Sequence, residues 1–317
     1  MFSEIVKWQQ EGNDRVDVVI ATPPCQGMSV ANHKKSETEI VRNSLVVESI
    51  EMVKKIKPRY FVFENVPAFL KTLCTLRGAE KPIGQAINEE LSEFYEIGSK
   101  VINFKNYGSN SSRTRTVVIG VSKDLNVLPE VLYPQFREEK TLREVIGHLP
   151  KLEWGEINSN DFYHNFRVYR EEMRAWVHNL KEGESAFDNE DDSLKPHKIV
   201  DGKIVVNTQK NGDKYKRQYW DKVAPCIHTR TDIFSSQNTV HPEEDRVFSI
   251  RELMCMMSIP ESFKWVEKDL SELNGLLDAE KRKLLKKEEL NIRQSIGEAV
   301  PTGVFREIAK NIAHQYK

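Results

Sequence analysis

The hydrophobic pattern near the start of the chain predicts a strand, a helix and a second strand. Residues 16–21 are a nearly unbroken apolar, β-branched run, typical of a strand buried on both faces, and two prolines soon follow it. From Ser36 to Ile56, apolar residues recur at helical spacing behind a capping-box pattern. A second apolar run covers residues 60–66. A crossover of this length predicts that the two strands are parallel.

The remaining pattern continues as α/β and then loses its regularity. It predicts helices at 82–94, 142–146, 246–257, 270–290 and 303–314, and strands at 100–104 and 116–121. From about Lys151 to Val240, aromatic residues, charges and turns replace the periodicity. We therefore predict an α/β domain over 1–150, a smaller irregular domain over 151–240, and return helices over 241–317 that complete the first domain.

Composition narrows the class of protein. With 317 residues, 39% of them apolar and 30% charged, the chain can bury a sizeable core. It has no membrane-length apolar run and no signal-peptide pattern, so we expect a cytoplasmic protein and no membrane partner. The four cysteines lie far apart without metal-type spacing, so no metal site is predicted. Because the net charge is −1, nucleic acid would have to meet local basic patches.

Candidate chemistry gathers where the two predicted strands end. Cys25 lies on the Pro-Pro-Cys turn, and Glu64 lies near the end of the second run. Adjacent parallel strands are about 4.8 Å apart, so these side chains would share a sheet edge where α/β proteins place active sites. Arg113 and Arg115 alternate at the start of a strand and would project to one face. For Cys25, the alternative is that the side chain is a small apolar residue of the core. For Arg113 and Arg115, the alternative is that they lie on a solvent-exposed hairpin edge.

These residue types suit covalent attack on a pyrimidine ring. The thiolate of Cys25 would add to C6, while Glu64 holds a proton against N3 and accepts from the exocyclic amine. An arginine that donates a hydrogen bond to O2 would complete the contacts to the base. The carbon C5 then becomes nucleophilic enough to accept a methyl group.

A basic and aromatic stretch in the irregular region suits nucleic-acid contact. Lysines and arginines alternate there with aromatic rings, which fit phosphate contact and stacking: Lys210, Lys214, Lys216 and Arg217 with Tyr215, Tyr219 and Trp220. Such a patch alone is weakly specific.

The order of short motifs resembles that of the DNA (cytosine-5) methyltransferase family. The matching segments are 21–26 (Ala-Thr-Pro-Pro-Cys-Gln), 42–45 (Arg-Asn-Ser-Leu), 63–66 (Phe-Glu-Asn-Val), 111–115 (Ser-Ser-Arg-Thr-Arg), 246–260 and 294–301 (Gln-Ser-Ile-Gly-Glu-Ala-Val-Pro). The resemblance extends over about residues 16–313, and only 151–240 is unconstrained. These matches, in the family's order, make coincidence a poor explanation.

The resemblance implies S-adenosylmethionine-dependent methylation of cytosine C5 in double-stranded DNA, with the target base flipped out, as in restriction–modification systems. Cys25 would be the nucleophile, Glu64 would contact N3 and N4, Arg115 would contact O2, and Arg113 would support the loop. By similarity, the other expected contacts are Pro24, Leu45, Glu298 and Ala299 for the methyl donor, and Gln26, Ser29, Lys214, Lys216 and Arg217 for DNA. The region 151–240 would be the target recognition domain in the major groove.

Three positions depart from the family pattern. Ser111 stands where the family has Gln, Glu298 where Asn is usual, and residues 255–257 (Cys-Met-Met) where Arg-Leu-Gln is common. The first and third concern contacts that position loops. The second places a negative charge near a donor that carries its own carboxylate. Cys25 and Glu64 are unaffected.

The family's Phe-x-Gly-x-Gly loop is absent, because no Gly-x-Gly occurs anywhere in the chain and only 24 residues precede Cys25. We therefore predict an α/β fold with an incomplete Rossmann-like methyltransferase sheet that lacks its first strands, and a bare edge on the strand at 16–21. A second chain or a missing segment would carry the Phe-x-Gly-x-Gly half. The alternative is a catalytically silent DNA-binding or regulatory subunit. An RNA methyltransferase is disfavoured because 151–240 is long enough for a DNA recognition domain.

Overall fold

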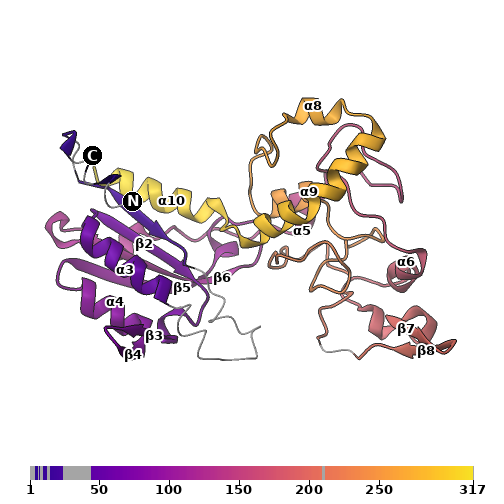
Figure 1. The fold of residues 1–317 in the computed structure, drawn as a ribbon, viewed down its shortest axis with the longest axis horizontal. Coiled ribbons are helices and arrows are strands. Elements are labelled where there is room, and N and C mark those ends of the chain that lie inside the picture. The colour runs from indigo at the N-terminus through magenta and orange to yellow at the C-terminus, as the bar shows by residue number, and fades with distance from the viewer. Residues whose placement is uncertain are drawn as a thin grey trace. The chain divides into compact units, whose positions relative to one another are not determined.

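The structure of the protein, a computed structural model, describes residues 15–23, 44–208 and 211–316, together with residues 4, 5, 7 and 10–12 (Figure 1). The chain divides into two compact parts. Unit 1 contains Met1–Phe104, Thr114–Phe136 and Phe305–Lys317, and unit 2 contains Lys105–Arg113 and Arg137–Val304. The predicted functional boundaries at residues 150 and 240 stay a prediction.

Unit 1 is built on a mixed four-stranded sheet in the order β1-β2-β6-β5. Its elements are β1 (Val18–Ala21), α3 (Ser44–Ile56), β2 (Tyr60–Asn65), β3 (Leu73–Leu76), β4 (Ala79–Pro82), α4 (Ile83–Leu91), β5 (Tyr95–Asn103), β6 (Thr114–Ser122) and most of α10 (Thr302–His314). The predicted parallel pair is confirmed, since Val18 of β1 lies opposite Tyr60 of β2. β6 is antiparallel to both β2 and β5. The hairpin of β3 and β4 was not predicted.

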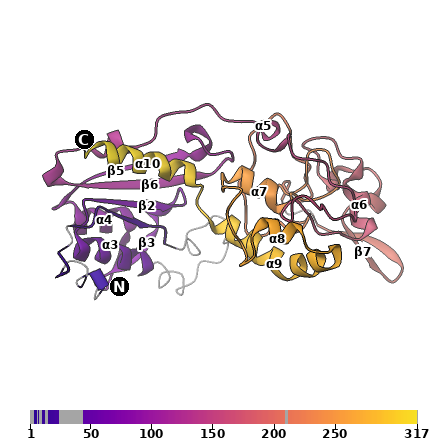
Figure 2. The ribbon, with the colours of Figure 1, turned by 90° about the horizontal axis from the view of Figure 1, so that it is seen from above.

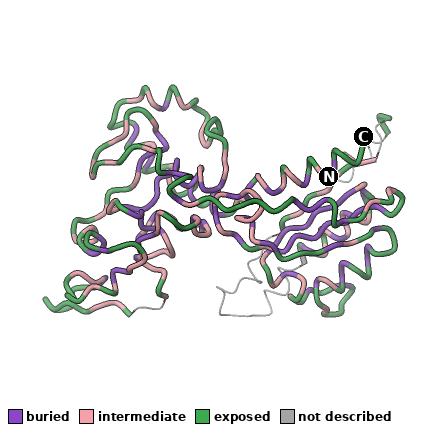
Figure 3. The backbone as a smooth tube through the Cα atoms, turned by 180° about the vertical axis from the view of Figure 1, so that it is seen from behind, coloured by how far each residue is buried: buried purple, intermediate pink, exposed green. Residues whose placement is uncertain are grey.

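Helices cover both faces of this sheet. Figures 1 and 2 show α3 and α4 on one face and α10 on the other. Side chains of β2 point alternately to the two faces of the sheet. Phe61 and Phe63 pack into the core under α3 and α4. The ring of Tyr60 lies 6.3 Å, between centroids, from the ring of Tyr316, which follows α10. Gly120 of β6 lies opposite Phe61, and a Cβ atom there would come within 1.9 Å of the Phe61 ring. The sheet is therefore buried at its centre, as the apolar run predicted (Figure 3).

Unit 2 contains more helix and more irregular backbone. Its elements are α5 (Leu142–Ile146), α6 (Glu171–His178), β7 (His197–Val200), β8 (Lys203–Val206), α7 (Ile250–Met256), α8 (Leu270–Asn274) and α9 (Asp278–Glu298). One core joins α5, α7 and α9, and a second surrounds Trp176 and Phe234. In the part of the chain that the structure describes, no helix has the length and apolar character needed to cross a bilayer.

Local caps decide several helix starts. The helix predicted at 142–146 is confirmed as α5, and Thr141 caps it: its hydroxyl accepts from the backbone N–H of Glu144 while the Glu144 carboxylate accepts from the Thr141 N–H. The start predicted for the helix 246–257 is wrong. α7 begins only after Ser249, whose hydroxyl caps the helix in the same way.

Two further boundaries correct the sequence prediction. Residues 270–290 do not form one helix, because α8 ends at the C-cap Gly275 and α9 begins at Asp278. α9 then extends to Glu298, so the first half of the motif 294–301, predicted as a turn, is helical.

A buried ionic network stabilises the segment before α7. Arg246 donates to both carboxylate oxygens of Glu252 at 2.8 Å and to those of Glu244 at 3.0 and 2.9 Å. Burial alone would raise the pKa of Glu252, but Arg246 outweighs burial and holds that pKa well below its usual value. Burial lowers the pKa of His241 to about 4, so this imidazole is neutral near pH 7.

Candidate active site

Glu64 and Arg115 form the centre of the candidate site. Glu64 lies near the carboxyl end of β2, where only 5% of its surface is exposed. Arg115 lies on the neighbouring strand β6, and its Nε is 3.1 Å from Oε1 of Glu64. Its Nη1 donates to the carbonyl oxygen of Thr114 at 2.8 Å. The sheet register therefore brings together the carboxylate and the second arginine that the sequence singled out.

Asn65 fixes the chain that leads to the predicted nucleophile. Its Nδ2 donates to the carbonyl oxygen of Pro23 at 2.8 Å, and its Oδ1 accepts from the Val66 N–H at 2.9 Å. Pro23 precedes Cys25 by two residues. Cys25 itself, with the rest of residues 24–43, lies outside the described residues. Sequence reasoning did not include Asn65 among the site residues, although it follows Glu64 directly.

Arg113 belongs to unit 2 and contacts the end of α9. It is 7% exposed, and its Nη1 donates to the carbonyl oxygen of Gly297 at 3.4 Å. Gly297 packs directly against another backbone segment, because a Cβ atom there would lie 2.4 Å from the carbonyl carbon of His228. A larger residue at this position would force the segments apart, so the glycine of the motif 294–301 has a steric role.

Two departures from the family pattern contact each other. The hydroxyl of Ser111 donates to the sulfur of Met257 at 3.9 Å, and the side-chain amide of Asn110 donates to the carbonyl oxygen of Cys255 at 2.8 Å. The loop before Arg113 is thus held by the residues that replace the family's usual set. The changes at 111 and at 255–257 are complementary.

The residues predicted to face the methyl donor are divided between the two units. Leu45, in the first turn of α3 in unit 1, exposes 49% of its surface. Glu298 and Ala299 lie at the end of α9 in unit 2, where Glu298 accepts from the side chain of Gln294 at 2.9 Å. Pro24 lies outside the described residues.

The predicted DNA contacts have different environments. The half-buried Lys216 places Nζ 3.3 Å from Asp213, and the carbonyl oxygen of the half-buried Lys214 accepts from the Ser185 hydroxyl at 2.8 Å. Arg217 is only 2% exposed and its Nη2 donates to Asp245 at 2.9 Å. Its guanidinium group is therefore used inside unit 2. The other two expected DNA contacts, Gln26 and Ser29, lie outside the described residues.

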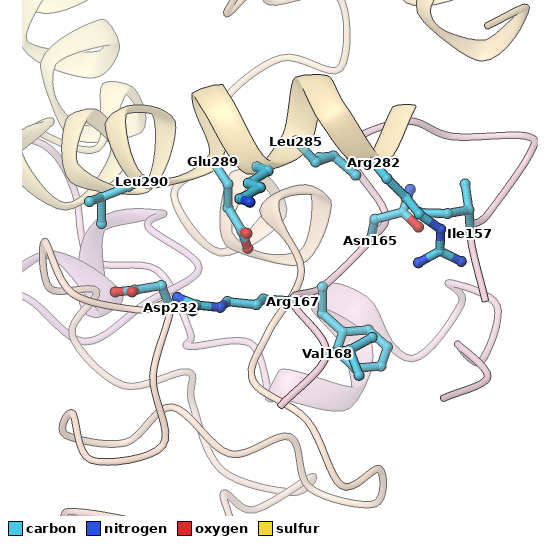
Figure 4. A pocket seen from close by; sticks show the side chains of 11 residues that line it. Ile157, Asn165, Arg167, Val168, Asp232, Arg282, Leu285, Glu289 and Leu290 are labelled. Carbon is cyan, nitrogen blue, oxygen red and sulfur yellow. The ribbon is translucent and has the colours of Figure 1, made fainter. Parts of the chain in front are cut away.

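A pocket of about 460 Å³ lies in unit 2 between α9 and residues 165–168. Figure 4 shows side chains of α9, among them Arg282 and Glu289, projecting toward the segment that carries Arg167 and Val168. Glu289 accepts from Arg293 at 2.8 Å. No sequence motif marks this pocket. In the described ranges, no group of three or more His, Cys, Asp or Glu side chains is placed to hold a metal ion.

The sequence matches a family model described as C-5 cytosine-specific DNA methylase over residues 2–314. The Type II methyltransferase M1.HgaI of Avibacterium volantium is 29% identical over 314 residues, which are 95% of this chain and 80% of the relative. The Type II methyltransferase M1.HphI of Haemophilus parahaemolyticus is 28% identical, over 94% of this chain and 68% of the relative.

Solved structures of methyltransferases share the fold. A prophage-encoded protein of E. coli, assigned as a DNA modification methyltransferase, superposes with a TM-score of 0.64 at 18% identity, over 99% of this chain and 83% of that one. The Dnmt2 methyltransferase of S. pombe gives a TM-score of 0.53 at 12% identity, over 95% and 78%. The α/β methyltransferase fold with a mixed sheet is therefore confirmed.

Proposed function

Because the chain belongs to the C-5 cytosine-specific DNA methylase family, and is thus a DNA cytosine-5-methyltransferase, we propose a specific route for its reaction. A methyl group passes to C5 of a cytosine flipped out of double-stranded DNA, through a covalent adduct between Cys25 and C6. The family in general uses S-adenosylmethionine, and the relatives named above are Type II methyltransferases. Such enzymes act in restriction–modification systems.

The observation that supports this proposal most is the Glu64–Arg115 pair beside the anchored end of β1. The two side chains meet at 3.1 Å, and Asn65 holds Pro23 next to the same strand. The thiol of Cys25, two residues beyond Pro23, would then be within reach of a base that Glu64 and Arg115 hold.

Binding of the cytosine would replace the contact between Glu64 and Arg115 by contacts of each side chain with the base. The base presents O2 to the guanidinium group of Arg115, and N3 and N4 to the carboxyl group of Glu64. A buried carboxylate without a cationic partner is unfavourable in its charged form. When Arg115 turns toward O2 of the base, Glu64 therefore favours its protonated form, which can donate the proton to N3. Arg113 supports the loop from unit 2 through its bond to Gly297.

The thiolate of Cys25 then adds to C6 of the held base. The proton on Glu64 is shared with N3, which lets the ring take up the electron pair and makes C5 nucleophilic. After C5 has gained the methyl group, its proton passes to a water molecule, the electrons of the C5–H bond re-form the C5–C6 double bond, and the proton shared with N3 returns to Glu64. The bond between Cys25 and C6 breaks, and the aromatic ring and the thiolate are restored.

S-adenosylmethionine, when bound, supplies the electrophilic methyl group. The exposed apolar side chain of Leu45 fits contact with the flat, weakly polar part of such a ligand. By the family resemblance, Pro24, Glu298 and Ala299 are further proposed contacts of the methyl donor. Glu298 already accepts from Gln294 at 2.9 Å, which orients its charge.

Two sets of residues are proposed to contact DNA. Gln26 and Ser29 would close over the flipped base, and Lys214 and Lys216 would contact phosphates from the recognition domain at 151–240. Arg217, although adjacent, would position this segment through Asp245 instead of contacting DNA directly.

The edge of β1 is the basis for a second part of the proposal. In the described part of the chain β1 pairs only with β2, and Ile20 on it is 56% exposed. Such an edge is a template for strand addition. A second chain or a further segment that carries a Phe-x-Gly-x-Gly half would cover this edge and complete the donor site.

Transfer of a labelled methyl group tests both parts. Wild-type chain together with a fragment bearing the Phe-x-Gly-x-Gly half should label cytosine C5 in duplex DNA, and Cys25→Ser should bind the same DNA without labelling it. DNA binding without any label in the complete assembly would instead support the silent, regulatory alternative. Full labelling by the chain alone would contradict the need for a second half.

A further inference from the structure

The hairpin of β7 and β8 exposes an unusual amount of apolar surface. Ile199 is 67% exposed, Val200 49%, Ile204 46% and Val205 50%. The hairpin is a separate two-stranded sheet, and Figure 3 shows its tube mostly exposed. A two-stranded ribbon is marginal by itself, and clustered exposed apolar side chains commonly mark a surface that meets a partner.

The ribbon has a defined register and a tight turn. The turn residues Asp201 and Gly202 both have positive φ, 50° and 74°, as the hairpin turn that fits strand twist requires. Lys198 lies opposite Val205, and Val200 lies opposite Lys203. Because residues two apart share a face, these two lysines and two valines form one face of the ribbon, here called the Lys/Val face.

The base of the ribbon is anchored in the core of unit 2. The ring of His197 packs edge-on against Trp176 at 5.4 Å, and the same Trp176 meets Tyr215 at 6.0 Å. Tyr215 lies between Lys214 and Lys216, the residues proposed to contact phosphates. One buried tryptophan thus packs against both the base of the ribbon and the basic segment, so the two are anchored in the same core.

We propose that the Lys/Val face enters the major groove of the DNA substrate and contributes to target recognition. A two-stranded ribbon fits the width of that groove, lysines can reach phosphates or guanine edges, and valines suit the thymine methyl. This inference rests on DNA being the substrate, as proposed above. It assigns the contact to residues that no motif of the family marks.

The charge on the ribbon favours DNA over a protein partner. Lys198 and Lys203 are exposed and form no ion pair within the described residues. The acidic groups nearby include Asp201 in the turn, Asp191 and Asp192 before β7, and Glu172, whose Oε1 lies 3.7 Å from Nε2 of His197. Asp192 pairs with Lys195 at 2.8 Å and Asp191 accepts from the Ser193 N–H at 2.8 Å, so neither competes for the two lysines.

The salt dependence of DNA binding by the full chain tests the assignment. In the variant Lys198→Ala/Lys203→Ala, the slope of log affinity against log salt should fall by about 2, because each lost phosphate contact removes about 0.9. Lys198→Arg/Lys203→Arg should keep the wild-type slope. A matched control, Lys268→Ala/Lys283→Ala, removes two exposed lysines elsewhere in unit 2 and should leave the slope unchanged.

An unchanged slope in the ribbon variant, or an equal fall in the control, would overturn the proposal. So would a wild-type dimer, seen by sedimentation, that becomes a monomer in Val200→Ser/Val205→Ser without loss of DNA affinity, because the ribbon would then be a protein interface. These outcomes are separate from the chemistry. The control variant Lys268→Ala/Lys283→Ala should form the covalent Cys25 adduct as the wild type does in the complete assembly, whereas a wild-type protein that binds DNA with the full salt slope but forms no adduct would contradict only the catalytic route.

Discussion

Replacing Asn65 with alanine should slow adduct formation far more than it weakens DNA binding. Asn65 is 3% exposed and bridges the end of β2 to the residue two positions before Cys25. Without the amide, the Pro23 carbonyl oxygen loses its 2.8 Å hydrogen bond to the end of β2. A displacement of about 1 Å in a reacting group can cost about 100-fold in rate, so we expect a loss of that order.

The cost in stability can be worked from the two hydrogen bonds. The donor to Pro23 and the acceptor for the Val66 N–H each contribute about 1 kcal/mol net, and both partners are only half-buried, so water can replace part of the loss. Asn65→Ala should therefore lower the free energy of unfolding by less than about 2 kcal/mol. This is too little to unfold the protein.

A single-turnover assay separates these effects. Adduct formation on a duplex carrying 5-fluorocytosine is followed with the complete assembly, and urea unfolding is measured on the same samples. The control Asn65→Asp keeps an acceptor for the Val66 N–H but loses the donor to Pro23, so it should react as slowly as the alanine variant. If either variant forms the adduct at the wild-type rate, the bond between Asn65 and Pro23 does not position the nucleophile.

Three further predictions concern other residues. Glu64→Gln should lower methyl transfer severely with little change in DNA affinity, as measured by single-turnover labelling and by titration; an unchanged rate would remove Glu64 from the mechanism. Between pH 6.5 and about 4, the unfolded state binds more protons than the folded state at His241, because its folded pKa is about 4. Stability in urea should therefore fall by about 3 kcal/mol as pH drops through that window, and His241→Gln should flatten this dependence. Gly297→Ala should cost about 1–3 kcal/mol of unfolding free energy, because its Cβ would strike the His228 backbone; calorimetry that finds wild-type stability would show that the segment shifts freely.

Local signals predicted the elements whose cause is local. The β-branched runs gave the parallel pair of β1 and β2, and the Thr141 cap fixed the start of α5. Glu64 and an arginine were expected to contact the same base because of the chemistry of pyrimidine attack, and the family resemblance assigned that contact to Arg115. The register that brings them to 3.1 Å is a property of the folded sheet.

Contacts between distant residues could not be predicted in this way. The basic segment around Arg217 predicted that this side chain contacts DNA. In the structure, its guanidinium group donates to Asp245, which is 28 residues away in sequence. The bond between Asn65 and Pro23 joins residues 42 apart. The hairpin of β7 and β8 was not predicted. Most residues on both of its faces are exposed, so its strands lack the alternation of apolar and polar residues that marks a half-buried strand.

The identity of the nucleophile is the central claim, and peptide mass spectrometry of the trapped complex tests it most directly. The complete assembly is incubated with the methyl donor and a duplex carrying 5-fluorocytosine, digested, and searched for the peptide that bears the nucleotide. The account predicts one modified peptide, with the methylated base attached to Cys25, and none from the Cys25→Ser protein. An adduct on Cys74, Cys226 or Cys255, or no adduct from an assembly that still methylates cytosine, would contradict it.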